Sequence, residues 1–481
     1  MQDSLLSSIQ NGLLWALNSS NNFLWSYVLI AVLILAGLYF TINSGFVQFG
    51  MFKEMVKLLA DGRSKSESKG TSSFQAFCMS TASRVGTGNL AGVALAVGAG
   101  GPGAVFWMWL IALIGSASAF VESTLAQIYK EKTPHGFRGG PAYYMEKALG
   151  NRSLGIVFSI LITICFGFIF NAVQANTIAA AFHGAFDIEA KWMALILVVI
   201  SAPVIMGGVR RIAVVAEVIV PIMAIAYLFI VIYVLVVNFS QIPAVISLIL
   251  ESAFGLREMA AGAVGAALMQ GIKRGLFSNE AGMGSAPNAA ATASVSHPVK
   301  QGLIQTLGVF TDTILICTAT AMLILVSGVE AAGAEDGIKL TQAALQSQVG
   351  SWGGIFIAVA ILLFAYSSII GNYYYGEANI DFIHRGDSKL KMIYRFAALG
   401  MLVFGALVKV QTVWDMADLF MALMALVNIY AIIKLGPIAF AALKDYRQQK
   451  KEGKDPVFRA SNIGIKEGAE CWEEPKEQVV L

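Results

Sequence analysis

The chain has 481 residues, of which 57% are hydrophobic and only 13% are charged, with a formal net charge of +3. Soluble domains carry about 25% charged residues, so this composition excludes an ordinary water-soluble globular protein. Apolar residues instead come in runs of about 17 to 29, and each run can cross a hydrocarbon core about 30 Å thick as a helix.

The first predicted membrane helix covers residues 23–47, inside an N-terminal unit at 1–50. Residues 1–22 contain no Lys or Arg, so we expect a retained helix and no cleavable signal peptide. The stretch from Leu5 to Leu17 could lie along the membrane surface as an amphipathic helix.

Ten further spans are predicted, which makes the protein an all-α polytopic membrane protein with about eleven transmembrane helices. They lie near residues 74–98, 103–129, 155–183, 192–208, 212–237, 259–288, 301–329, 352–380, 394–410 and 413–435.

Most Lys and Arg residues fall in alternate connections, at 51–72, 129–152, 209–211, 273–300 and 384–395, and in the tail from 434. The opposite side holds only Lys191, Arg257, Lys339 and Lys409. Because positively charged short loops stay in the cytoplasm, this distribution predicts an outside N-terminus and a cytoplasmic C-terminus. The polar tail at 446–481 is expected to be a mobile cytoplasmic extension.

Two spans are poor continuous helices because glycines and polar residues interrupt them: SRVGTGNLAGVALAVGAGG (83–101) and MQGIKRGLFSNEAGMGSAPNAA (269–290). A shift of 190 positions aligns them as R-x4-N-x-A-G, with Arg84 on Arg274 and Asn89 on Asn279. An odd number of crossings separates the two copies, so we expect an inverted repeat formed by residues 74–238 and 256–435.

A broken helix in a bilayer exposes backbone N–H and C=O groups, which cost several kcal/mol each unless something satisfies them. Free N–H groups at a half-helix suit a carboxylate, and free carbonyls suit an ammonium group or a metal ion. The paired breaks therefore favour an amino acid bound together with sodium. Close helix packing by small residues is the alternative explanation of the glycines.

Four motifs identify a family: GTGNLAGVA (86–94), GGPGAVFWMW (100–109), GGPAYYMEKAL (139–149) and KRGLFSNEAGMGSAPNAAA (273–291). The sequence resembles the alanine or glycine:cation symporter family over residues 20 to 445. The resemblance implies a LeuT-like 5+5 inverted repeat with one additional N-terminal helix. It also implies sodium-coupled uptake of a small neutral amino acid, alanine or glycine, across a bacterial-type inner membrane.

Candidate substrate contacts lie in three spans. Glycine backbone can approach a carboxylate closely, and the resemblance places the span containing Asn171 and Gln174 beside the substrate. The candidates are Gly86, Thr87, Gly88, Asn89, Asn171, Gln174, Phe277, Tyr366, Ile370 and Asn372.

Neutral oxygens near the same breaks are candidate sodium ligands, because carbonyl, amide and hydroxyl oxygens bind hard cations without adding charge. They are Val85, Gly88, Asn89, Asn279, Ser367 and Ser368. The two asparagines could equally cap half-helices, and the two serines could bond to the preceding helical turn.

Ionisable residues within spans are candidates for gating or for structural ion pairs: Arg84, Glu122, Arg274, Glu280 and Asp312. Arg84 could pair with Glu122, Glu280 or Asp312. Proton coupling through these acids is the nearest alternative to sodium, and a channel is a more distant one. We expect no enzyme activity, cofactor, disulfide or nucleic-acid partner, since no such motif occurs.

Overall fold

The computed structural model describes residues 2–62, 71–134, 136–256, 261–330, 337–386 and 388–472, with backbone alone at 2–11, 13, 209, 210 and 261. Regular structure within these ranges is helical, apart from the hairpin of β1 (Glu131–Thr133) and β2 (Gly136–Arg138) and an isolated bridge between Thr71 and Ala293. Eight helical stretches of the described chain are long and apolar enough to cross a membrane.

Each predicted span coincides with one helix or with two or three consecutive helical segments, which confirms the all-helical polytopic class. The spans are α1 (Gln2–Phe23), η1 (Leu24–Leu29) and α2 (Ile30–Asn43); α5 (Ser73–Arg84), η2 (Gly88–Gly92) and α6 (Val93–Gly100); α7 (Ala104–Ile128); α9 (Arg152–Ile162), η3 (Thr163–Phe170) and α10 (Asn171–Phe186); α11 (Ala190–Met206); α12 (Gly208–Val237); α14 (Ala261–Asn279) and α15 (Ala286–Ala290); α16 (Pro298–Val309), η5 (Phe310–Cys317) and α17 (Thr318–Ser327); α19 (Trp352–Ile383); α20 (Ser388–Leu407); and α21 (Val410–Lys451).

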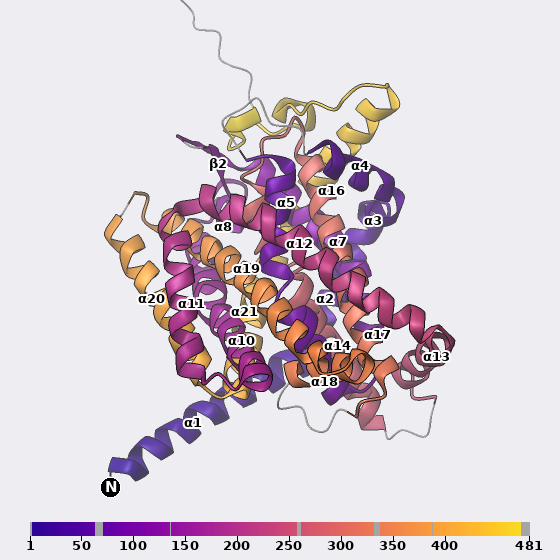
Figure 1. Ribbon diagram of the computed structural model, residues 1–481. Helices are drawn as coiled ribbons and strands as arrows, with labels where there is room; N and C mark the ends of the chain where they lie inside the picture. The colour runs from indigo at the N-terminus through magenta and orange to yellow at the C-terminus, as the bar shows by residue number, and fades with distance from the viewer. Residues whose placement is uncertain are drawn as a thin grey trace, which may run out of the picture.

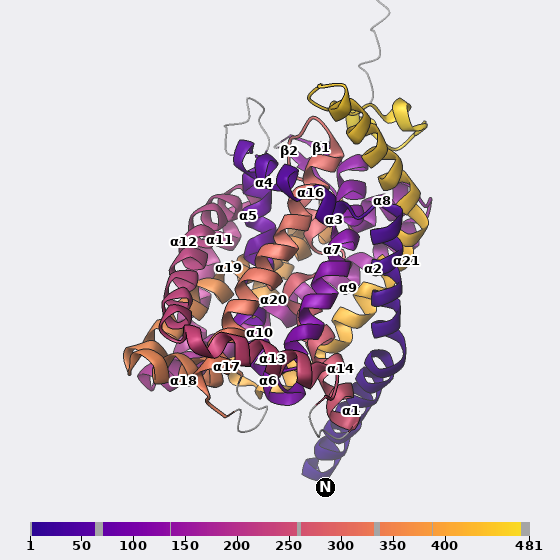
Figure 2. The same cartoon turned by 90° about the vertical axis from the view of Figure 1, so that its right-hand side faces the viewer.

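Segments expected as connections also contain helices. They are α3 (Val47–Gly50), α4 (Phe52–Asp61), α8 (Pro141–Lys147), η4 (Phe239–Gln241), α13 (Ile242–Ala253) and α18 (Gly337–Val349). Figures 1 and 2 place α4 and α8 at the end of the molecule near the tail, and α13 and α18 at the opposite end. The stretch from Leu5 to Leu17 is helical, continues into α2, and projects away from the body.

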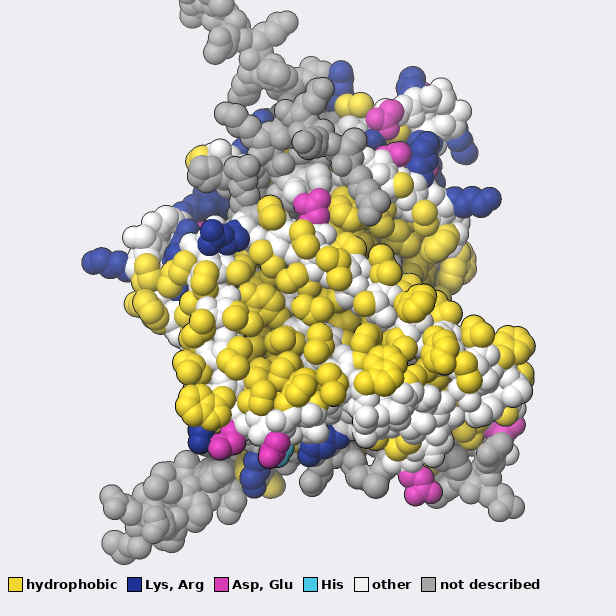
Figure 3. Space-filling view, viewed as in Figure 1, with side chains coloured by type: hydrophobic (Ala, Val, Ile, Leu, Met, Phe, Trp, Pro, Cys, Tyr) yellow, Lys and Arg dark blue, Asp and Glu magenta, His cyan; other side chains and the backbone are white. Residues whose placement is uncertain are grey.

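Apolar side chains form a broad band around the visible face of the molecule, and charged side chains gather above and below it (Figure 3). Many large hydrophobic residues are exposed, among them Phe229, Ile225 and Val199. An exposed apolar surface of this extent is what a protein crossing a bilayer requires.

The tail is not a mobile extension over its described part. After α21, the chain turns back through η6 (Ala460–Ile463) and η7 (Glu470–Trp472), and Phe458 is buried between the rings of His297 and Trp472. Lys300 pairs with Asp455 at 2.7 Å, and the indole N–H of Trp472 donates to the carbonyl of Gln127 at 2.8 Å. The polar composition of the tail predicted mobility, but a few buried aromatic side chains are enough to hold the tail against the membrane helices.

Both predicted helix interruptions are present, at Val85–Gly86 between α5 and η2, and at 280–285 between α14 and α15. The alignment by 190 positions is wrong in detail. It places Val85 and Gly86 on Gly275 and Leu276, which lie inside α14. The first break directly follows Arg84, whereas the second begins six residues after Arg274. An alignment of the two arginines therefore does not align the two breaks.

Lys273 and Arg274 do not belong to a connection, as the charge count had assumed. They lie within α14, before the second break, and both contact Asp418 of α21. The positive charge is buried there because an acidic partner neutralises it.

Candidate ligand site at two helix breaks

The first break places backbone against two neighbouring helices. A Cβ atom on Gly86 would overlap the hydroxyl of Ser368 in α19 and would lie 2.9 Å from the side-chain oxygen of Gln174 in α10. Only glycine fits this approach. The break is therefore a meeting point of α5, α10 and α19.

Side-chain oxygens satisfy the backbone amides of this break. The Gly86 N–H donates to Oδ1 of Asn89 at 2.9 Å, and the Thr87 N–H donates to Oε1 of Gln174 at 2.9 Å. The Thr87 hydroxyl also lies 2.7 Å from the same oxygen. Asn171 instead donates to a carbonyl of its own helix. Gln174 thus reaches the break, whereas Asn171 does not hydrogen-bond to it.

The second break is held by a carboxylate. Gly282 and Gly284 both have φ of +83°, and their N–H groups donate to the two oxygens of Glu122 at 3.2 and 3.0 Å. The side-chain amide of Asn428 adds a third bond to Glu122, at 2.8 Å. The protein thus supplies its own anion to these amides, and Glu122 is a cap for the break, not a partner of Arg84.

Aromatic rings cover the first break from the side of α14. The ring of Phe277 lies 4.5 Å from that of Phe170 and 4.6 Å from that of Trp414, and it packs directly against Gly88. The Arg274 guanidinium lies 4.6 Å from the Trp414 ring. Its Nη2 contacts both carboxylate oxygens of Asp418, at 2.8 and 2.6 Å. A buried ion pair therefore adjoins the aromatic cover.

Five oxygens converge where α5 meets α19. The Ser368 hydroxyl lies 2.9 Å from the carbonyl of Ala82, 3.5 Å from that of Val85 and 3.2 Å from that of Phe364. The Ser367 hydroxyl lies 2.8 Å from the Phe364 carbonyl and 3.4 Å from that of Ala82. Both hydroxyls thus donate to a carbonyl of the preceding helical turn, which was the alternative role of these serines. The same neutral oxygens also suit a sodium ion.

Three other candidate sodium ligands are engaged elsewhere. The carbonyl of Gly88 accepts the Val93 N–H within the helix, and Oδ1 of Asn279 accepts the N–H of Ala281. Asn89 caps the Gly86 amide with its oxygen and donates its nitrogen to Asp312 at 2.7 Å. Both asparagines therefore accept from backbone amides of the breaks themselves, and neither caps the half-helix that follows it.

Asp312 joins the two breaks. Besides the bond from Asn89, its carboxylate accepts hydrogen bonds from the hydroxyls of Ser278 and Thr313, each at 2.8 Å. Ser278 lies in the last turn of α14 and Asn89 in the first turn after the other break. A single carboxylate thus fixes both half-helices relative to each other.

Arg84 pairs with none of its three predicted partners. Its side chain is buried, and Nη1 donates to the carbonyl of Gln305 at 3.2 Å. Within the described part of the chain, no carboxylate oxygen lies within 4.0 Å of it, and Nε and Nη2 have no hydrogen-bond partner.

The candidates on α19 point in different directions. Asn372 contacts Ser83 of α5 at 2.6 Å, and Ile370 is fully buried. The hydroxyl of Tyr366 instead donates to the carbonyl of Ile200 in α11 at 2.9 Å. Tyr366 therefore packs against α11 and is not part of the wall opposite the glycines.

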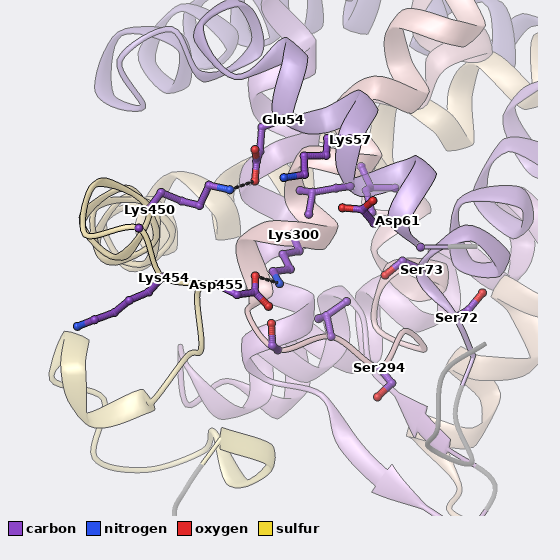
Figure 4. A pocket seen from close by; sticks show the side chains of 16 residues that line it. Glu54, Lys57, Asp61, Ser72, Ser73, Ser294, Lys300, Lys450, Lys454 and Asp455 are labelled. Atoms are coloured by element: carbon purple, nitrogen blue, oxygen red, sulfur yellow. Dashed lines mark hydrogen bonds and ion pairs between the residues drawn. The ribbon is translucent and has the colours of Figure 1, made fainter. Parts of the chain in front are cut away.

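A cavity of about 600 Å³ opens elsewhere, at the end of the molecule near the tail (Figure 4). Charged side chains of α4, α16, α21 and the tail line it, including the pairs Lys450–Glu54 at 2.8 Å and Lys300–Asp455 at 2.7 Å. No residue of either break lines it, so this cavity is separate from the candidate ligand site.

Sequence reasoning missed Ala82, Phe364 and Asp418. Ala82 and Phe364 act through carbonyl oxygens, which carry no residue-type signal, although Phe364 lies three and four positions before the two serines. Asp418 did carry a signal, because it is an acid within a predicted span.

The amino-acid sequence is similar to that of known membrane transporters along almost its whole length. The family described as "Sodium:alanine symporter family" matches residues 10–460. The chain is 55% identical over 453 residues to the probable sodium/glutamine symporter GlnT of Bacillus subtilis (strain 168), covering 94% of this chain and 95% of that protein. It is 54% identical over 462 residues to the amino-acid carrier protein AlsT of the same organism, covering 96% and 98%.

A solved structure of MhsT in complex with L-phenylalanine superposes with a TM-score of 0.55 at 14% identity, covering 81% of this chain and 90% of that one. At such identity the likeness shows the fold alone. It confirms the LeuT-like architecture that the motifs implied.

Proposed function

Since the chain belongs to the sodium:alanine symporter family, we propose that it carries alanine or glycine into the cell together with sodium, both bound at the helix breaks. Family membership makes it a multi-pass membrane protein and a cation-coupled amino acid symporter, not an enzyme. The identity of the amino acid and the residues that hold it are the proposal.

The observation that carries the proposal is the difference between the two breaks. Glu122 occupies the amides of Gly282 and Gly284, whereas the amides at Gly86 and Thr87 face neutral side-chain oxygens. A substrate carboxylate competes more readily with an amide oxygen than with a resident carboxylate. We therefore assign the substrate carboxylate to the first break, where it shares the donors of Thr87 with Gln174.

Sodium is assigned to the oxygens of Ala82, Val85, Phe364, Ser367 and Ser368, because this set joins α5 to α19 beside the same break. Binding of either solute orders the backbone that the other contacts, so each raises the affinity of the other. A membrane potential of 100 mV contributes about 2.3 kcal/mol per charge moved inward, which supports accumulation by one sodium.

A small side chain fits the aromatic cover, because Phe277 already packs against Gly88 and between Phe170 and Trp414. Glutamine is the second candidate substrate, because the GlnT relative is named for it. Glutamine would require Phe277 or Trp414 to move.

Uptake of labelled alanine into proteoliposomes tests the proposal. We expect uptake with an inward sodium gradient, none with choline, and inhibition by excess glycine. Uptake driven equally by a proton gradient without sodium would favour proton coupling instead. Stronger competition by glutamine than by alanine would overturn the assignment of the amino acid.

A further inference from the structure

Three buried carboxylates lie near the breaks, and they differ in the donors that satisfy them. Glu122 accepts three N–H groups. Asp312 accepts one amide N–H and two hydroxyls. Glu280 has only the hydroxyls of Ser83 and Ser285, although it is 1% exposed. Glu280 is therefore the least well satisfied of the three.

One of these two hydroxyls is contested. The oxygen of Ser83 lies 2.8 Å from Oε1 of Glu280 and 2.6 Å from Oδ1 of Asn372. A hydroxyl has one proton and can donate to only one acceptor. Three oxygens thus face one another around a single proton, an arrangement that a bound cation stabilises.

Two further polar groups of α19 face the same region without a partner. The side-chain nitrogen of Asn372 and the hydroxyl of Tyr375, both fully buried, have no hydrogen-bond partner among the described residues. Tyr375 follows Asn372 by three positions and so lies on the same face of α19. The amide nitrogen is a donor and does not bind a cation, so it is the hydroxyl oxygen of Tyr375 that adds to the oxygens of this cluster.

Charge also points to a cation. The three carboxylates face one guanidinium, that of Arg84, which pairs directly with none of them. Burying an unpaired carboxylate costs far more than burying one beside a positive charge. The backbone of Glu280 is also unusual, because its φ of +58° is rare for a residue other than glycine. The fold holds this carboxylate in place despite that conformation.

We propose that Glu280, with Ser83, Ser285 and Asn372, forms a second site for a monovalent cation, separate from the oxygens around Ser367 and Ser368. Ser83 adjoins Ala82, so the two sites use neighbouring residues of the last turn of α5. The cation is either a second sodium ion or the ammonium group of the substrate, since both bind to carboxylate and hydroxyl oxygens. This assignment rests on the proposed symport and adds a charge-binding residue to it.

Glu280→Gln tests the site, because it removes the charge with almost no change of shape. Binding of radioactive sodium to the purified protein is measured without amino acid, and alanine binding is measured in saturating sodium. If the site holds sodium, the variant binds one sodium ion fewer per chain and loses cooperativity. If it holds the ammonium group, sodium binding without alanine is unchanged and alanine affinity falls about tenfold or more.

Controls separate these results from misfolding and from failure of the proposed function. Glu189→Gln makes the same chemical change at an exposed position and should alter neither measurement. Ser83→Ala keeps the carboxylate and should weaken the same binding step about threefold, which covers the case in which Glu280→Gln does not fold. Normal sodium and alanine binding in both Glu280→Gln and Ser83→Ala would overturn the inference. Wild-type uptake without sodium would instead overturn the proposed function.

Discussion

At the scale of single residues, Gln174 is the side chain that links a membrane helix to the free amides of the first break. It accepts hydrogen bonds from the backbone and the hydroxyl of Thr87, at 2.9 and 2.7 Å. Its neighbour Asn171, on the same face by spacing, bonds within its own helix. The helical spacing of Asn171 and Gln174 indicated both residues. Their hydrogen bonds show that only Gln174 contacts the break.

Gln174→Ala should raise the half-saturating alanine concentration about fivefold, because it removes an oxygen that orients the Thr87 amide, a loss of roughly 1 kcal/mol. Asn171→Ala should change it less than twofold. Sodium-driven alanine uptake in proteoliposomes measures both. Equal effects of the two substitutions would contradict the assignment of Gln174 to the break.

At the scale of elements, glycine decides where the second helix can break. Gly284 has φ of +83°, and a Cβ there would lie 2.8 Å from both Phe158 and Pro141. Gly265, within α14, has no atom within 4 Å of an added Cβ. Gly284 is therefore required for the backbone conformation of the break, whereas Gly265 can be replaced by a residue with a side chain.

Gly284→Ala should lower the melting temperature and abolish alanine uptake, since it adds backbone strain of about 1–3 kcal/mol and a clash beside the Glu122 cap. Gly265→Ala should leave uptake intact and slightly raise stability, because alanine favours a helix. Thermal unfolding in detergent and uptake assays measure the pair. Full activity of Gly284→Ala would show that the break tolerates a side chain.

The tail element is tied to the body around Lys130, just beyond α7. Its ammonium group donates to Gln127 and Ala293 and lies 4.0 Å from the ring of Phe137 and 4.9 Å from that of Trp472. Burial lowers the pKa of Lys130 from its ordinary 10.5 to about 7, with the nearby positive charge of Lys132 acting in the same direction and Cys471 opposing it. The folded protein therefore binds this proton less tightly than the unfolded chain does.

Because the unfolded chain holds more protons between pH 7 and 10.5, Lys130 should make stability rise with pH in that window. Below pH 7 both states are protonated, and its contribution no longer changes. Melting temperatures from pH 7 to 9 should increase more steeply in the wild type than in Lys130→Met, which cannot titrate. If the melting temperatures of the wild type and of Lys130→Met rise equally with pH, Lys130 is not the cause of the pH dependence.

At the scale of the whole molecule, the proposed orientation places the tail and α4 in the cytoplasm and α13 and α18 outside. Buried Cys78, Cys165 and Cys317 are poorly accessible, so a Cys471→Ser background allows single cysteines to be labelled. Lys409 and Lys451 are exposed near opposite ends of α21 and report on the two sides.

In intact cells, a membrane-impermeant thiol reagent should label Lys409→Cys and should label Lys451→Cys only after permeabilisation. The physical reason is the positive-inside bias of the connections. Labelling of Lys451→Cys in intact cells, and of Lys409→Cys only after permeabilisation, would show that the protein has the opposite orientation in the membrane. The fold itself would not be affected by that result.

Hydropathy and glycine content act locally along the chain, so the spans, the all-helical class and the two helix breaks could be predicted from residue order alone. Gln174, Glu122, Glu280 and Asp312 could be singled out as candidates in the same way, since polar residues inside apolar spans are conspicuous. The prediction from residue order misjudged the packing of the tail and the register of the repeat, which depend on contacts between distant segments.

The pairs of groups that meet could be identified only from the three-dimensional packing. Glu122 caps Gly282 and Gly284, Arg274 pairs with Asp418, and carbonyls of Ala82 and Phe364 face the serines of α19. These partners are far apart in the chain, and several are backbone atoms that every residue possesses. Helix packing selects among them, and no local pattern in the sequence encodes that choice.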